Sequence, residues 1–215
     1  MATACQRYFE AAHYAARRPV SASRKAKTRR RTCETASASR GNLGSPPIDE
    51  EDTLTAYHEA GHAVIGFALG ATIDSVQLGG EADEWLPERF GDCRVNWGRV
   101  DPKADSQRQR EIQTILAGPV AEMIYSGEAV HPAFHGPWQW DWRQASRIAA
   151  ELYTDAAART RVLERAILVL HRTMKTDGCW AAVAAIADEL LAHEFIESDT
   201  IEEIVGFWLR HHPSP

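Results

Sequence analysis

The sequence predicts an α+β fold that is mostly helical, with a small β-sheet next to a helix that carries two histidines. Apolar residues recur at helical spacing over most of the chain after residue 50. Two short segments instead alternate apolar and polar residues, as half-buried strands do. Because 215 residues suffice for a substantial core, we expect one folded domain over residues 48–212, after a tail over residues 1–47.

The tail differs from the rest of the chain in charge. Residues 1–45 hold ten Lys and Arg against two Asp and Glu, while the remainder holds fourteen basic and twenty-eight acidic residues. The net charge of −6 therefore combines a basic tail with an acidic body. Since the tail is rich in Ser, Ala and Arg, we expect it to be disordered. It could be an organelle transit peptide, a polybasic arm, an adaptor tail or a solvated extension.

Composition also excludes several classes of protein. No aromatic residue interrupts Arg24–Arg31, which disfavours specific binding of nucleic acid. No apolar run approaches roughly eighteen residues, so we expect no transmembrane segment and a soluble, cytoplasmic protein, with organelle targeting through the tail as the alternative. The four cysteines show no C-x-x-C spacing, which disfavours a disulfide or cysteine–zinc framework.

The first predicted helix follows the acidic run Asp49–Asp52, which suits the positive end of a helix dipole. Either Asp52 or Thr53 can serve as its N-cap. Apolar residues then recur at helical spacing until Gly70, which is the expected C-terminal cap.

This helix contains the motif H-E-x-x-H, formed by His58, Glu59 and His62. Two histidines four residues apart lie on one helix face, so both imidazoles can bind a single ion. Glu59 points partly away from that face and can reach a water molecule activated by the metal, which makes it the candidate general base. The motif predicts a zinc hydrolase, although two core histidines could also produce the pattern by chance.

Two strands and a long helix follow. Residues 72–78 and 93–100 have the pattern of strands, separated by an acidic loop over residues 81–92. Residues 104–125 are predicted to be helical, with a cap at Gly127. Because proline lacks an N–H, Gly118–Pro119 should kink this helix or divide it into two. The remaining pattern predicts a loop over 128–137 and helices over 138–154, 158–175, 179–194 and 200–211.

A catalytic zinc site usually has three protein ligands, so the two histidines need a partner. The metzincin extension would require glycine and histidine where this chain has Ile65 and Ala68, which excludes that class. A short carboxylate near a helix start, such as Asp141, is a suitable ligand. The downstream candidates are Glu122, His131, His135 and Asp141.

Segments spread over Asp52–Leu209 follow the order and spacing of a known family. Ala56–Ala63 contains the zinc motif, and Leu116–Glu122 is similar to a Leu-Ala-Gly-x-x-Ala-Glu helix. Asp141–Ala145 falls at an Asp-Leu-x-x-Ala segment, and Val183–Ile204 is similar to the closing helices. In these features the chain resembles the peptidase domain of the FtsH-type ATP-dependent zinc metalloproteases.

The resemblance implies a zincin-like helical peptidase domain in which Asp141 joins His58 and His62 as ligands of Zn²⁺. Glu59 is then the general base, and Glu122 has a structural role. By the same resemblance, the strand over residues 93–100 is an edge strand beside the active site.

An edge strand could bind substrate by strand addition, with Trp97 as a candidate substrate-binding residue. Trp138, Trp140 and Trp142 flank the predicted aspartate ligand. They could line a cleft, but aromatic packing between helices is the favoured interpretation.

The sequence contains no G-x-x-x-x-G-K-[ST] loop and no membrane anchor, both of which the family has. We therefore expect a zinc metalloendopeptidase without ATPase activity of its own, which cleaves peptides or unfolded proteins. A separate ATPase partner could supply substrates, and a homo-oligomer is compatible with the resemblance. The alternative is a catalytically silent zinc module that acts as a binding or adaptor protein, but such a module has no need of Glu59 beside the metal.

Overall fold

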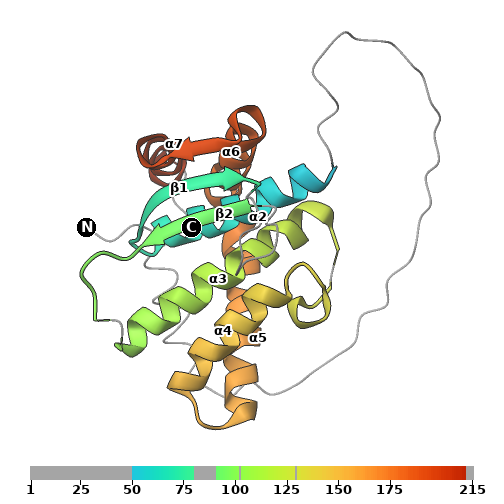
Figure 1. Cartoon of the computed structure of the whole chain (residues 1–215), viewed down its shortest axis with the longest axis vertical. Coiled ribbons are helices and arrows are strands. Elements are labelled where there is room, and N and C mark those ends of the chain that lie inside the picture. Colours follow the sequence, from blue (N-terminus) through green and yellow to red (C-terminus); the bar gives the residue numbers. More distant parts are fainter. Residues whose placement is uncertain (1–49, 80–90, 102, 129, 212–215) are drawn as a thin grey trace, which may run out of the picture.

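The structure is a computed structural model that describes residues 50–79, 91–101, 103–128 and 130–211. This part of the chain forms six α-helices, one short 3-10 helix and a three-stranded antiparallel sheet (Figure 1), so the prediction of a mostly helical α+β fold is confirmed. The helices are α2 (Glu50–Ala68), α3 (Asp105–Ser126), η1 (Pro132–Phe134), α4 (Gln139–Leu152), α5 (Ala156–Met174), α6 (Asp177–His193) and α7 (Ser198–His211). The basic tail predicted over residues 1–47 lies outside the described residues.

The strands are β1 (Thr72–Leu78), β2 (Gly91–Asn96) and β3 (Phe195–Glu197), in the spatial order β2-β1-β3. The bounds predicted for the first strand are confirmed. The second strand begins and ends earlier than predicted, and its first residue, Gly91, belonged to the predicted loop. A register shift between Ile73 and Ser75 lets β1 bury both Ile73 and Val76 although these positions differ in parity.

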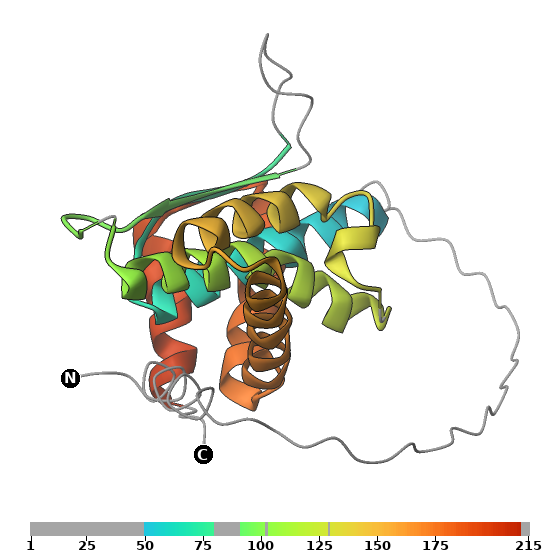
Figure 2. The same ribbon diagram turned by 90° about the horizontal axis from the view of Figure 1, so that it is seen from below.

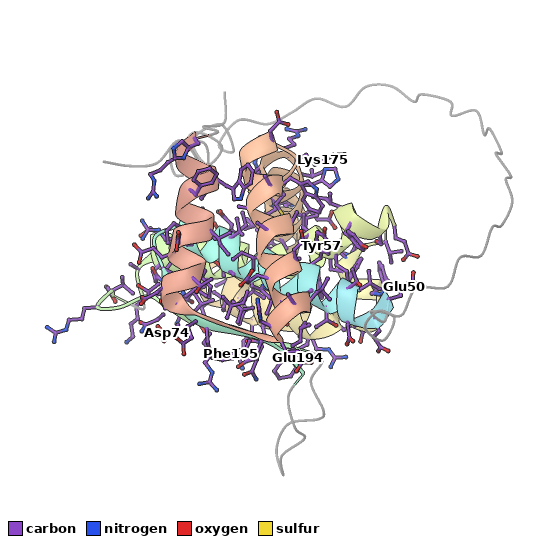
Figure 3. All side chains as sticks on the ribbon, turned by 90° about the horizontal axis from the view of Figure 1, so that it is seen from above. Glu50, Tyr57, Asp74, Lys175, Glu194 and Phe195 are labelled. Atoms are coloured by element: carbon purple, nitrogen blue, oxygen red, sulfur yellow. The ribbon has the colours of Figure 1, made fainter. Side chains whose placement is uncertain are left out.

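The third strand was not predicted, because three residues are too few to show alternation. It follows from the end of α6, where Glu194 adopts a left-handed conformation with φ of 60° and reverses the chain. The carbonyl of Glu194 then accepts a hydrogen bond of 2.8 Å from the N–H of Leu78 in β1. In Figure 3, Glu194 and Phe195 lie at the opposite end of α6 from Lys175.

The helices lie on one face of the sheet, which Figure 2 shows almost edge-on. The helix α2 packs against the sheet and also contacts α3 and α6, so it occupies the centre of the domain. Its approach to α3 is close because Gly61 has no side chain. A Cβ at this position would lie 2.6 Å from the carbonyl oxygen of Ala117 and 2.7 Å from the Cβ of Ala121.

Two predictions made from local sequence patterns are wrong, one at Pro119 in α3 and one at the N-terminus of α2. The helix α3 is continuous through Pro119, so the predicted division into two helices is wrong. Its packing against α2, α4 and α5 outweighs the cost of about 3 kcal/mol that proline imposes within a helix. The helix α2 begins at Glu50, so Asp52 and Thr53 lie inside its first turn and neither is the N-cap.

Other local predictions are confirmed. Gly127 caps α3 in a left-handed conformation, and Gly70 ends the turn after α2 with φ of 97°. Within the described residues, no helix has the length and apolar character needed to span a membrane.

Candidate metal centre

Three side chains from two helices meet at one partly buried point. His58 and His62 come from α2 and Asp141 from the first turn of α4, and their potential ligand atoms all lie within 4.8 Å of one another. The Nε2 atom of His58 is 3.2 Å from Oδ2 of Asp141, and Nε2 of His62 is 3.9 Å from Oδ1. This group could hold a metal ion, and two imidazole nitrogens with one carboxylate oxygen suit zinc.

In both histidines Nδ1, the ring nitrogen that is not directed at Asp141, makes a hydrogen bond to a residue of α3. Nδ1 of His58 donates to Oε2 of Glu122 over 3.0 Å, and Nδ1 of His62 donates to the backbone carbonyl of Thr114 over 2.8 Å. These partners assign a proton to Nδ1 of each ring, so the Nε2 atoms, which face Asp141, are the nitrogens that would bind a metal ion. Histidines that bind metals usually have such an outer partner, so the residues present fit a metal ion.

A glycine of α3 makes room for both imidazoles. A Cβ at Gly118 would lie 2.6 Å from Cε1 of His62 and 2.7 Å from Cδ2 of His58, closer than real contacts allow. The absence of a side chain at Gly118 therefore lets α3 approach the motif helix. The same approach brings the carbonyl of Thr114 within reach of His62.

The electrostatics of the centre are dominated by carboxylates. Burial disfavours a charge on His58, but hydrogen bonds to Asp141 and Glu122 outweigh burial and raise the pKa of His58 to about 10. Burial also opposes the charge of Asp141, yet its hydrogen bond with His58 lowers the pKa of this carboxyl. Burial lowers the pKa of His62, helped by the charge of His58. The carboxylates around the two imidazoles thus favour a cation.

Glu59 lies beside the ligand group but is not part of it. Its side chain is 8% exposed and lies against β2, where a Cβ on Gly91 would be 2.7 Å from Oε1 of Glu59. Burial raises the pKa of the Cys93 thiol, and the negative charges of Glu59 and Asp92 raise it further. The carboxylate of Glu59 therefore faces the start of β2 and remains close enough to His58 to influence its pKa.

The other predicted ligand candidates have different contacts. Glu122 binds His58 rather than joining the ligand group, and it also accepts a hydrogen bond of 2.6 Å from the indole of Trp138. Nε2 of His131 is 3.0 Å from Oε1 of Glu164, while the His135 ring lies against Trp138 with centroids 4.1 Å apart.

The tryptophans near Asp141 differ in environment. Trp138 is buried, Trp142 is partly buried against the ring of His131, and Trp140 is 60% exposed. Trp97 is partly buried against the core and follows the last residue of β2. It lies six residues from Gly91, or about 20 Å along an extended strand, so the structure does not bring it beside Glu59.

Three features of the centre were missed by sequence reasoning. They are the carbonyl of Thr114, the space at Gly91 and the indole donor of Trp138. The density of tryptophans around Asp141 was a signal for the third feature, although it did not indicate which indole is buried. A backbone carbonyl leaves no mark in the sequence, and Gly91 resembles an ordinary loop glycine.

No protein-family model and no curated protein matches this chain. The chemistry of the centre is therefore the basis on which a function can be proposed.

Proposed function

We propose that this protein is a zinc-dependent metalloendopeptidase that hydrolyses peptide bonds of peptides or unfolded proteins. The observation that carries the proposal is the convergence of His58, His62 and Asp141 beside a buried Glu59 that stays outside the ligand group. Structural zinc sites usually have four protein ligands, whereas catalytic sites have three and an open position. The ligand group found among the described residues has three members.

Each residue has a defined task in this proposal. Zinc, when bound, would polarise the peptide carbonyl and activate a water molecule for attack. Glu59 accepts the proton of the attacking water and later delivers it to the leaving amine. Glu122 and the carbonyl of Thr114 keep the two imidazoles oriented throughout.

The position of Glu59 also supports the proposed substrate class. Its carboxylate lies at the start of β2, which is an edge strand of the described sheet. An extended peptide that pairs with β2 would run past this carboxylate, as in other cases of strand addition. Folded domains cannot present such a strand without unfolding locally, so we propose peptides, loose segments and unfolded proteins as substrates.

The test compares zinc content and cleavage of unfolded casein for wild type, Glu59→Gln and Asp141→Asn. Glu59→Gln should retain zinc but lose about 10²–10⁴-fold in cleavage rate, because a general base is removed. Asp141→Asn should bind zinc more weakly. The exposed residue Glu202 of α7 provides a matched control, since Glu202→Gln makes the same change far along the chain from the motif.

Three outcomes would contradict the proposal or part of it. Cleavage by Glu59→Gln at the wild-type rate would exclude Glu59 as the base. A wild-type protein that binds zinc but cleaves neither casein nor short peptides would favour a silent zinc module. Retention of full zinc affinity by Asp141→Asn would show that the third ligand is misassigned.

A further inference from the structure

Among the described residues, Trp138 is the largest fully buried side chain, and its indole nitrogen faces Glu122, which supports the predicted metal ligand His58. The side chain is 1% exposed, and Nε1 donates a hydrogen bond of 2.6 Å to Oε2 of Glu122. The same oxygen accepts the hydrogen bond of 3.0 Å from Nδ1 of His58. One carboxylate oxygen therefore connects the indole to a predicted metal ligand.

This arrangement restrains Glu122. The Glu122 residue is 8% exposed, and a buried carboxylate is costly unless donors compensate for the lost water. Hydrogen bonds to a charged acceptor are stronger than those between neutral groups, so the indole strongly favours one orientation of the carboxylate. Without the indole N–H, Glu122 would have one donor fewer and more freedom to rotate away from His58.

The ring of Trp138 also fixes the beginning of α4. Trp138 immediately precedes this helix, and its carbonyl accepts a hydrogen bond of 3.1 Å from the N–H of Trp142. The ring packs against His135, with centroids 4.1 Å apart. Asp141 lies in the first turn that these contacts anchor. The apolar part of the indole and its N–H thus support different ligands.

We propose that Trp138 is a positioning residue whose indole N–H sets the metal affinity of the centre by holding Glu122 against His58. The inference rests on metal binding by the proposed centre, but it does not depend on peptidase activity. It assigns a role to one tryptophan of the cluster around Asp141 and leaves the packing of Trp142 against His131 unchanged.

The experiment measures zinc affinity by chelator competition in the full chain. Trp138→Phe keeps an aromatic ring but removes the N–H, and we expect zinc affinity to fall about tenfold, the lower end of the range for outer partners of metal ligands. Trp142→Phe is the matched control, because Trp142 lies in the first turn of the helix that Trp138 precedes and packs against His131 instead. Its zinc affinity should stay within about twofold of wild type.

A double-mutant cycle identifies the route of the effect. If Trp138 acts through Glu122, then Trp138→Phe should have little further effect in a Glu122→Ala background, since the acceptor is already gone. An undiminished effect in that background would overturn the proposal and leave only packing. Wild-type zinc affinity in Trp138→Phe would also overturn it. A wild-type protein that binds no zinc would overturn the proposed function as well, so the two failures are distinguishable.

A measurement on the unmutated protein covers the case in which Trp138→Phe does not fold. The chain has seven tryptophans, whose indole N–H signals can be followed by ¹⁵N NMR during zinc titration. The signal assigned to Trp138 through its contacts with His135 should shift more than that of Trp142. The indole N–H proton of Trp138 should also exchange slowly with solvent, because it is buried and hydrogen-bonded. A Trp138 signal that does not move while zinc binds would contradict the proposal.

Discussion

The two sides of α2 hold the proposed catalytic groups in different ways. Toward α3 and α4, His58 and His62 are fixed by hydrogen bonds to Glu122 and to a backbone carbonyl. Toward β2, Glu59 lies in close contact with a strand that has a glycine at the point of approach. We call these the metal side and the base side. The groups proposed for metal binding and for proton transfer therefore have separate structural supports, so mutations should separate the two proposed roles.

The largest effect is expected on the metal side, from Gly118→Ala. The added methyl group would displace both His58 and His62, so zinc affinity should fall more than about 100-fold, beyond the usual loss for an outer partner. Overpacking should also reduce the free energy of unfolding by about 1–3 kcal/mol. Chelator competition and thermal unfolding measure the two quantities.

The control for this substitution is Gly206→Ala in α7. Both glycines are buried in helices, where alanine is otherwise favoured by about 1 kcal/mol. At Gly206 a Cβ would meet the end of the flexible Arg210 side chain at 3.0 Å, so this variant should retain its stability and its zinc. Equal tolerance of alanine at both positions would contradict the proposed packing of the metal side.

On the base side, Gly91→Ala should impair catalysis while leaving zinc bound. The new methyl group would overlap Oε1 and Cδ of Glu59, which would have to turn away from its position. A misplacement of about 1 Å can cost about 100-fold in rate, so we expect a loss of that order in casein cleavage. Zinc affinity should change less than about threefold.

Gly136→Ala serves as the matched control, because a Cβ there would meet no atom within 4 Å. It should cleave casein at the wild-type rate. If Gly91→Ala instead lost zinc and activity together, the two sides of α2 would not be separable.

A smaller effect should appear in the reactivity of Cys93. Burial and the charge of Glu59 raise the pKa of this thiol, which suppresses the reactive thiolate. Glu59→Gln removes the charge and lowers the pKa, but burial remains. Alkylation of Cys93 at pH 8 should therefore become faster by only about threefold.

The rate can be measured for each cysteine by mass spectrometry of labelled peptides. Buried Cys179 in α6 provides the internal reference, and its rate should be the same in wild type and Glu59→Gln. If the ratio of the Cys93 alkylation rate to the Cys179 rate is the same in wild type and Glu59→Gln, the Glu59 carboxylate does not face β2.

The sequence was most informative where contacts are local. The two histidines of α2 are one helical turn apart, so their shared face follows from spacing alone. The strand β1 was predicted with its observed bounds because its residue pattern is a property of the segment itself. Asp141 could be selected among several carboxylates and histidines only through a family resemblance, since its position depends on how α4 packs against α3.

The failures occur where tertiary contacts override local preference. Pro119 predicts a kink or a division of the helix, but helix packing on several sides keeps α3 continuous. The strand β3 depends on the left-handed turn at Glu194, a conformation that is uncommon outside glycine. The bond between Trp138 and Glu122 joins residues sixteen positions apart and depends on the direction of both side chains. Spacing contains no information about such directions.

Zinc X-ray absorption on the purified protein, combined with the zinc-to-protein ratio, tests the proposed metal centre most directly. We expect one zinc per chain, bound by two imidazole nitrogens and a carboxylate oxygen at about 2.0–2.2 Å. His58→Ala and His62→Ala should each abolish this signal. A coordination shell that contains sulfur at about 2.3 Å, or a wild-type chain that binds no zinc, would contradict the proposed centre.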